Sequence, residues 1–158
     1  MSRHPGAARV AISSAGLALA AAVAVASGGA AFVAVQAQER YSVWDGVYSE
    51  EQADRGKVEY EYNCGTCHIH DLTGDSIKDV PALAGDDFLG QWGGKTVAEL
   101  LDYMVTNMPA DSRGSLPKGT YADITSYVLK VNNFPAGKDV LGSDPARLAK
   151  TVIERQKK

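Results

Sequence analysis

The segment Cys64-Gly65-Thr66-Cys67-His68 determines how this sequence is interpreted. Its two cysteines are the only ones among 158 residues, so a scaffold held by several disulfides is excluded. Two thiols separated by two residues on a helical turn can reach the two vinyl groups on one porphyrin edge. The adjoining His68 then lies under the iron and offers an imidazole nitrogen as a ligand. This pattern is the attachment signal of c-type haem, and it predicts one covalently bound haem.

Three other kinds of site could use the same pair of cysteines. A thiol–disulfide exchange centre usually comes with a βαβ pattern, and the sequence shows no alternating strand pattern. A zinc site needs two ligands besides the two cysteines. His70 could be one of them, but no second pair of ligands exists, because His4 belongs to the N-terminal segment. A plain structural disulfide is the third alternative. The histidine that directly follows Cys67 favours haem over all three.

The first 37 residues carry the pattern of a secretory signal. A basic start precedes an uncharged, alanine-rich run from 10 to 35, and Val35-Gln36-Ala37 offers a cleavage site. We expect cleavage after Ala37, with a cut near Ala30 or Ala31 as the alternative. The run has 26 residues, enough to span a bilayer, so an uncleaved anchor is the other interpretation. Both interpretations predict export of the remaining chain, to a bacterial periplasm.

Composition and charge exclude several classes of protein. The chain is 45% hydrophobic and 22% charged, which is ordinary for a globular domain. Its 16 Lys and Arg against 19 Asp and Glu give a net charge of −3, and this balance does not predict a nucleic-acid partner. Removal of residues 1–37 leaves 14 basic against 19 acidic residues, which would steer the domain towards basic patches on partner proteins. Contact with a membrane is expected only if the N-terminal segment stays uncleaved.

Capping signals predict three helices after the signal segment. Ser49 and Gln52 form a capping box with two acids in the first turn, which predicts a helix from Glu50 to Asn63. The box at Thr96-Val97-Ala98-Glu99 opens a second helix with an apolar face, which ends before Pro109. A third helix is expected to start at a cap on Thr120 and to close at Asn132-Asn133-Phe134-Pro135. The chain therefore predicts a small all-α domain.

The segments around these helices look less regular. Residues 71–94 are rich in Gly, Pro and Asp and predict a long loop, of a kind that is often functional. The sequence after Gly137 is polar and predicts a tail with a short helix from Pro145 to Arg155. We therefore divide the exported chain into an N-terminal extension (38–47), a domain (48–135) and a polar C-terminal tail (136–158). A domain of about 90 residues has a marginal core, which a buried prosthetic group would complete.

Met108 is the expected second axial ligand of the iron. It follows the end of a helix and precedes Pro109, so it lies on a loop that could fold over the haem. Met104 falls in the apolar face of the helix and is expected in the core; it and an open iron remain the alternatives. His70 cannot swing to the other side of the ring and is expected as an exposed loop residue. An axial Met raises the reduction potential and closes the iron to substrates, which favours electron transfer over catalysis.

The spacing of Gly56, Tyr60 and Cys64 resembles that of class I cytochromes c, and the likeness runs from about Val47 to Pro135. The resemblance implies a class I cytochrome c fold, with helices packed around one haem c that is attached through Cys64 and Cys67 and contains iron. It also implies that the small Gly56 lets the last helix cross closely, with Ile124 and Tyr127 as the crossing partners.

The segment Pro81-Ala82-Leu83-Ala84-Gly85 is similar to a Pro-x-Leu-x-Gly segment of the same family. The resemblance implies that the Pro81 carbonyl accepts a hydrogen bond from the second ring nitrogen of His68, which fixes the tautomer of the ligand. Trp92 would pack at the haem edge or donate to a propionate, and ordinary core packing is equally open. Lys95 and Arg113 could neutralise propionates, with exposed solvated charge as the alternative for each.

The stretch from Tyr41 to Tyr48 is similar to monohaem cytochromes found with periplasmic quinoprotein or molybdenum dehydrogenases. The expected function is therefore that of a periplasmic electron carrier rather than an enzyme. Its expected partners are redox proteins: a dehydrogenase as donor and an oxidase or another cytochrome as acceptor. One alternative is a haem subunit within a periplasmic dehydrogenase complex. Another is a gas or redox sensor with an open haem.

Overall fold

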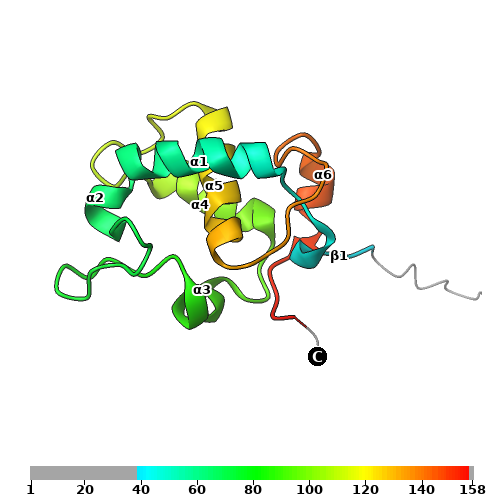
Figure 1. The fold of residues 1–158 in the computed structure, drawn as a ribbon, viewed down its shortest axis with the longest axis horizontal. Helices are drawn as coiled ribbons and strands as arrows, with labels where there is room; N and C mark the ends of the chain where they lie inside the picture. Colours follow the sequence, from blue (N-terminus) through cyan, green and yellow to red (C-terminus); the bar gives the residue numbers. More distant parts are fainter. Residues whose placement is uncertain (1–38, 157–158) are drawn as a thin grey trace, which may run out of the picture. The chain divides into compact units, whose positions relative to one another are not determined.

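The computed structural model describes residues 39–156, and the expected secretory segment at 1–37 lies outside them. Residues 39–156 fold as one compact unit. Figure 1 shows helices throughout this unit. The described residues contain two very short strands besides the helices. Within the described range, no helix is both long and apolar enough to cross a membrane. The all-α fold class expected from the capping signals is confirmed.

The elements follow one another in the order β1 (Tyr41–Ser42), η1 (Val43–Asp45), α1 (Glu50–Asn63), α2 (Gly65–His68), α3 (Gly85–Trp92), α4 (Val97–Asn107), α5 (Lys118–Val131), α6 (Pro145–Leu148) and β2 (Thr151–Val152). The two strands pair in parallel, with Tyr41 opposite Thr151 and Ser42 opposite Val152. Such two-residue strands leave no alternating pattern in the sequence, so they were not expected.

Helix α1 has the predicted bounds, and it makes its most extensive contacts with α5 (Figure 1). The Ser49 hydroxyl caps α1 by accepting from the Gln52 N–H at 3.2 Å. The second half of the predicted capping box was wrong, because the Gln52 side chain turns elsewhere. Its amide group pairs with the backbone N–H and carbonyl of Leu141 at 2.7 and 3.1 Å. Gln52 therefore joins α1 to the C-terminal segment instead of closing the cap.

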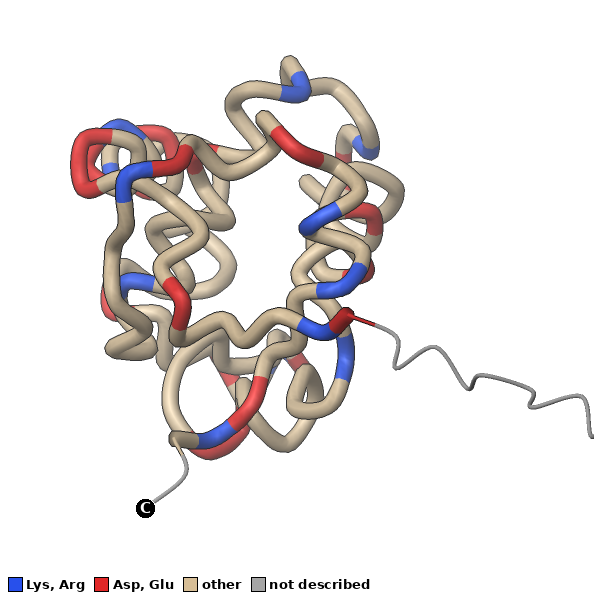
Figure 2. Tube along the Cα trace, turned by 90° about the vertical axis from the view of Figure 1, so that its right-hand side faces the viewer, with Lys and Arg blue, Asp and Glu red and all other residues tan. Residues whose placement is uncertain are grey.

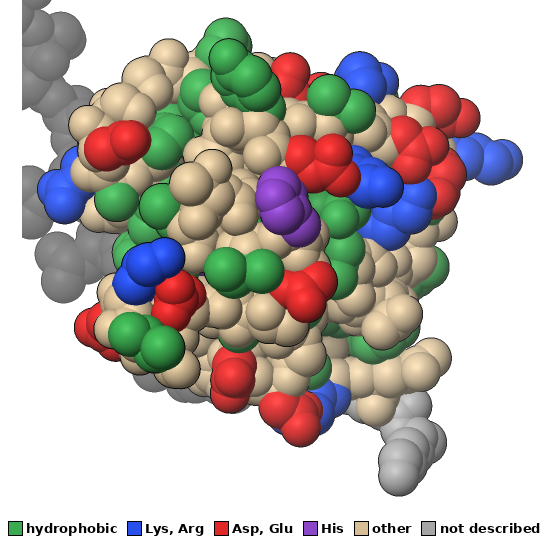
Figure 3. Space-filling view, turned by 60° about the vertical axis from the view of Figure 1, so that its left-hand side comes forward, with side chains coloured by type: hydrophobic (Ala, Val, Ile, Leu, Met, Phe, Trp, Pro, Cys, Tyr) green, Lys and Arg blue, Asp and Glu red, His purple; other side chains and the backbone are tan. Residues whose placement is uncertain are grey.

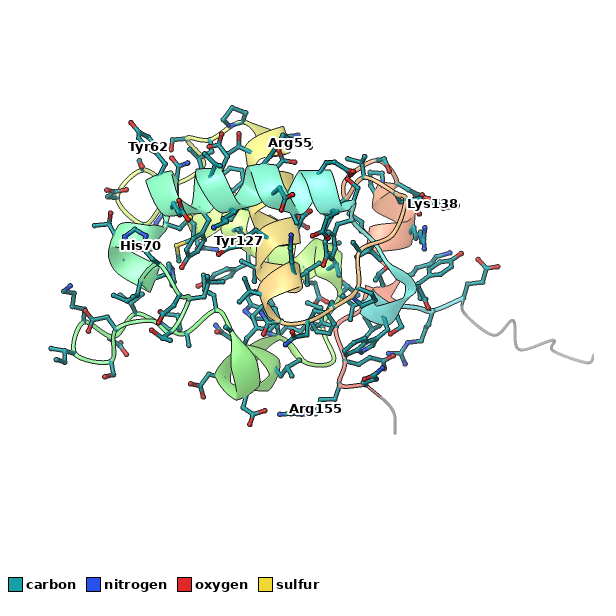
Figure 4. The ribbon with its side chains drawn as sticks, viewed as in Figure 1. Arg55, Tyr62, His70, Tyr127, Lys138 and Arg155 are labelled. Atoms are coloured by element: carbon teal, nitrogen blue, oxygen red, sulfur yellow. The ribbon has the colours of Figure 1, made fainter. Side chains whose placement is uncertain are left out.

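The crossing of α1 and α5 depends on Gly56, as the resemblance implied. Its Cα faces the backbone of Asp123 and Ile124. Tyr127 lies one turn further along α5, beneath α1 (Figure 4), and packs on Tyr60 with ring centroids 5.4 Å apart. The closest partner of Gly56 is therefore a backbone carbonyl, with Ile124 as its neighbour.

Ion pairs also join α1 to α5 at their exposed edges. Arg55 lies 3.0 Å from the carboxylate of Asp123. Lys130 contacts Glu50 and, at 2.8 Å, Asp54. Figure 2 shows basic and acidic residues interspersed along the chain. Exposed pairs of this kind contribute about 0–1 kcal/mol each, so apolar packing at the crossing holds the two helices.

Helices α4 and α5 start differently from each other. Thr96 and Glu99 form the complete predicted capping box at the start of α4. The predicted cap of α5 at Thr120 was wrong, because α5 already begins at Lys118. Pro117 is its N-cap residue and accepts through its carbonyl from the Tyr121 N–H at 3.2 Å. A proline has no N–H to leave unpaired at a helix start, so it can take this place without a capping hydroxyl.

The expected long loop at 71–94 contains a helix, α3. No capping signal marks the start of α3, because Ala84 occupies the N-cap position without a side-chain hydrogen bond. Two acids in the first turn favour the helix through its dipole. Phe88 and Trp92, four residues apart, bury one face of α3 against the core. Helix α3 was therefore missed because its amphipathic pattern is too short to recognise in the sequence.

The prediction of a polar tail at 136–158 was wrong, because most of its described residues belong to the folded unit. Leu141, Leu148 and Ile153 are buried in the core. The short helix there ends at Leu148, and the chain continues as β2 instead of a helix to Arg155. Its apolar residues form only short groups within a mostly polar segment, so the average polarity of the segment hid their burial. The N-terminal extension likewise packs onto the domain: the indole N–H of Trp44 donates to the Glu154 carbonyl at 2.8 Å.

Candidate functional site

The Cys-x-x-Cys-His motif forms one helical turn directly after α1. Cys64 ends α1 and precedes α2, and its carbonyl accepts from the N–H groups of Cys67 at 3.1 Å and His68 at 2.9 Å. These bonds fix the turn so that the two cysteines lie three residues apart on one helical face. Cys64 is half-buried and Cys67 is exposed, and both carry free thiols. The motif therefore presents two thiols and an imidazole from a rigid turn.

His68 is held in a defined orientation by the loop that follows α2. Its side chain is buried, with 7% of the residue exposed. Its Nδ1 lies 3.0 Å from the carbonyl oxygen of Pro81. A carbonyl only accepts, so Nδ1 carries the proton and Nε2 keeps its lone pair. Among residues 39–156, no group hydrogen-bonds to Nε2. The predicted contact with Pro81 is therefore present, and it leaves the other nitrogen available as a metal ligand.

The structure also bears on the alternatives for the cysteine pair. Burial, and to a smaller degree the charge of Cys67, raises the pKa of the Cys64 thiol to about 11. Thiol–disulfide exchange centres need a lowered pKa, so this thiol has the opposite character. In the described part of the chain, no three acidic, Cys or His side chains cluster to hold a metal ion. The geometry therefore favours neither an exchange centre nor a zinc site.

His70 lies on the outside of the motif. It is exposed, as expected, and Figure 4 labels it beside α2. Its ring covers Gly65, where a Cβ atom would stand only 2.9 Å from the His70 Nδ1. Figure 3 shows a histidine at the surface of this side of the molecule, among charged side chains. His70 thus shields the turn of α2 from outside and does not share the buried position of His68.

The two candidate thioethers lie at the C-terminal end of α4. Met108 is the C-cap residue, and its N–H donates to the Met104 carbonyl at 2.9 Å. Both methionines are half-buried. The Met104 Sδ lies 3.3 Å from the hydroxyl of Thr125 on α5. The Met108 carbonyl accepts from the hydroxyl of Tyr121 at 2.6 Å. Tyr121 and Thr125 were not singled out from the sequence, because only the packing of α5 on α4 brings them to this end of the helix.

Trp92 packs in the core with its ring between two neighbours. It makes an edge-to-face contact with Tyr103, with ring centroids 5.3 Å apart. The Nζ of Lys95 lies 4.6 Å from the centre of the Trp92 ring. No group within the described range accepts from the indole N–H, which leaves this donor free for a propionate. Arg113 is exposed. Roles of these residues towards haem stay predictions.

Two surface hollows among the described residues lie apart from the motif. The larger, of about 500 Å³, lies between the loop after α2 and helix α3. Pro81 is one of its lining residues, whereas Cys64, Cys67 and His68 are not. A second cavity of about 180 Å³ lies near α6. The site is therefore defined by the donor atoms of the motif.

Comparison with known families gives one match, and it covers the site. The model for the family described as cytochrome c oxidase, cbb3-type, subunit III matches residues 51–128. This range includes the Cys-x-x-Cys-His turn, Pro81, Trp92 and both methionines. Residues 51–128 form a class I cytochrome c domain. A domain of this family transfers electrons and contains haem c with iron.

Other comparisons add little to this cytochrome. A search of curated proteins gave no match. Among solved structures, the sulfane dehydrogenase SoxCD from Paracoccus pantotrophus is similar over 63% of this chain, with 20% sequence identity and a TM-score of 0.46. The match spans 52% of the length of that chain.

The residues of the cytochrome fit the haem that its family contains. The two free thiols suit thioether bonds, and the lone pair on the His68 Nε2 suits iron. The Pro81 carbonyl orients the His68 ring and makes the imidazole a stronger ligand. When bound, haem supplies a centre that gains and loses one electron reversibly. The two thiols and the oriented imidazole are thus in place in the folded chain itself.

Proposed function

We propose that this cytochrome carries single electrons between redox proteins in the periplasm, through one haem c attached at Cys64 and Cys67 and ligated by His68 and Met108. The hydrogen bond from the His68 Nδ1 to the Pro81 carbonyl carries the proposal, because it directs the opposite nitrogen to a metal. With Met108 as the second ligand, the iron would have no open position for a substrate. A relay of electrons, rather than catalysis, is therefore the function that fits it best.

The choice of Met108 over Met104 rests on their surroundings. The Met104 thioether already contacts the Thr125 hydroxyl on α5. Met108 lies where α4 ends, and only its backbone groups make hydrogen bonds within the described chain. Its thioether is therefore the one left without a polar partner. A thioether ligand stabilises the reduced iron and raises the reduction potential, which suits an electron carrier.

Export of the domain is part of the proposal and rests on the sequence of residues 1–37. A basic start, an uncharged run and a small-residue cleavage site are typical of secretory signals. Attachment of c-type haem outside the cytoplasm agrees with this. Mass spectrometry of protein from a periplasmic fraction tests both points at once. We expect a mass that equals the chain from residue 38 plus one haem; an intact N-terminus in the membrane fraction would favour the anchor.

Two isosteric variants test the ligand assignment. Met108→Leu should lose the weak charge-transfer band between thioether and ferric iron and should lower the reduction potential. Met104→Leu removes the neighbouring thioether and should leave the band unchanged. The sharp α-band of a reduced c-type haem must be present in both. A band that survives in Met108→Leu would show that another residue ligates the iron. Fast binding of CO by the reduced wild type would favour the open-haem sensor instead.

A second candidate function is that of a haem subunit in a larger oxidoreductase. The family model that matches the chain is described as an oxidase subunit, and this observation favours it. Size-exclusion chromatography of the cytochrome from its native host discriminates the two functions. A carrier elutes at the size of one short chain, whereas a subunit elutes with its enzyme. Transfer of electrons from a partner only within that complex would favour the subunit.

A further inference from the structure

Helix α5 contacts both methionines of α4 in a matched pattern. Met104 lies on α4 and Met108 caps the C-terminal end of this helix four residues later, while Tyr121 and Thr125 are four residues apart on α5. The Thr125 hydroxyl lies 3.3 Å from the Met104 Sδ, and the Tyr121 hydroxyl lies 2.6 Å from the Met108 carbonyl oxygen. Residues four apart share a helical face. One face of α5 thus contacts the two methionines at different groups: Thr125 contacts the Met104 side chain, and Tyr121 contacts the Met108 backbone.

The contact with Met108 comes from a buried tyrosine. Tyr121 is 1% exposed, so its phenol has no water to bond in place of the carbonyl. The Met108 carbonyl has a second donor, the Gly114 N–H at 3.2 Å. The Met108 N–H is bonded as well, in the last turn of α4. Both backbone groups of Met108 are therefore held, and the phenol fixes the carbonyl from the side of α5.

The contact with Met104 keeps that thioether in the core. Thr125 is fully buried, and its single hydroxyl proton has two acceptors within reach: the Tyr121 carbonyl at 2.7 Å and the Met104 Sδ at 3.3 Å. Either arrangement leaves the Met104 sulfur against a polar group of α5. The Met108 sulfur has no such partner among the described residues. The pattern leaves one thioether occupied and the other available.

We infer that Tyr121 is the positioning residue for Met108: its phenol fixes the Met108 backbone so that the thioether stays directed to the iron. This inference rests on the proposed ligation by Met108. Loss of the phenol hydroxyl would leave the carbonyl with only the Gly114 N–H. The end of α4 could then move, and the bond between thioether and iron would be replaced more readily by an external ligand.

Two matched tyrosine variants of the haem-loaded protein test the inference. Tyr121→Phe removes the hydroxyl that faces Met108. Tyr48→Phe removes a buried hydroxyl that donates at the same 2.6 Å distance to another backbone carbonyl, that of Phe134. Both variants keep the ring and lose the short bond from the phenol to a backbone carbonyl. Tyr121→Phe also loses a weaker contact, in which the Tyr121 hydroxyl accepts from the Leu116 N–H at 3.5 Å. The folding stability of both variants is therefore measured alongside. Imidazole is titrated into the oxidised proteins while the charge-transfer band is followed. We expect imidazole to displace Met108 about three- to tenfold more readily in Tyr121→Phe, the range for one lost hydrogen bond, and no change in Tyr48→Phe.

The outcomes separate this inference from the proposed function. Equal imidazole affinity in Tyr121→Phe and the wild type, with the band present in both, overturns the inference and leaves the ligation by Met108 intact. An equal rise in both tyrosine variants overturns it too, because the effect would then reflect general destabilisation. A band that survives in Met108→Leu overturns both.

Discussion

Gly56 of α1 lies so close to α5 that a Cβ atom at this position would stand 1.8 Å from the carbonyl oxygen of Asp123 and 3.1 Å from the Ile124 nitrogen. These neighbours are backbone atoms, so no side chain can turn away to make room. The two helices that carry the haem-binding turn and the contacts to both methionines are thus fixed to each other at one point. Any side chain at Gly56 forces them apart.

We predict that Gly56→Ala destabilises the cytochrome by about 3 kcal/mol or more, at or above the upper range for an overpacked core. Guanidinium unfolding of the haem-loaded protein measures this loss. The matched control is Gly119→Ala, in α5 itself, where a Cβ atom meets nothing within 4 Å. Alanine there should be neutral or stabilise by up to about 1 kcal/mol. Equal effects of the two variants would contradict the close crossing.

The Gln52 side chain gives a second prediction, about the C-terminal segment. Its amide satisfies both backbone groups of Leu141, and Gln52 is buried with only 1% exposed. Gln52→Leu keeps a similar volume but leaves a buried N–H and a buried carbonyl without partners. The expected loss of stability is about 2–4 kcal/mol. The free energy of opening that amide hydrogen exchange measures at Leu141 should fall by the same amount.

The control for this variant is Gln91→Leu, which replaces an exposed glutamine on α3. A surface change of this kind stays within about 0.5 kcal/mol of the wild type. If Gln52→Leu left the exchange at Leu141 unchanged, the C-terminal segment would be held by its apolar residues alone.

The helices that begin with a local capping signal could be predicted from the sequence. Ser49 and Thr96 lie directly before acidic first turns, so α1 and α4 start where expected. The start of α5 and the whole of α3 lack a capping hydroxyl, and only tertiary packing shows them. The burial of Leu141 and Leu148 also depends on partners far away in the chain. Local signals could not reveal it, because neither leucine belongs to a long apolar run.

The site divides in the same way. The Cys-x-x-Cys-His turn is local, so its three residues could be recognised from their spacing. The contact between His68 and Pro81 spans 13 positions and was implied only by family likeness. Tyr121 and Thr125 stand on a different helix from the methionines that they contact. Their roles could not be predicted, because buried hydroxyl groups carry no motif and are recognised only once α4 and α5 are packed together.

The two cysteines should differ in what their loss does. Cys64 packs against the core, whereas Cys67 is exposed. Each single alanine variant should keep one thioether bond, and only Cys64→Ala should also lower stability, by about 1 kcal/mol or more. The double variant should lose all haem colour from the chain on acid–acetone extraction. His70→Ala is the control and should keep both bonds. Covalent haem in the double variant would contradict attachment at this turn.

The capping box of α4 predicts a pH dependence of stability. The Thr96 N–H at 2.7 Å and hydroxyl at 2.9 Å donate to the Glu99 carboxylate, and these bonds lower its pKa from the ordinary 4.5. A lowered pKa in the folded state stabilises the fold above the unfolded pKa, and this contribution is lost as the pH falls through the folded pKa. Glu99→Gln should therefore be less stable than the wild type at neutral pH, and the difference should shrink progressively as the pH falls from the unfolded pKa through the lower folded pKa. Urea unfolding across this range measures it. In a Thr96→Ala background the pH-dependent part should shrink, since one donor is gone; a difference that stays constant with pH would mean that the charge of Glu99 plays no part in the cap.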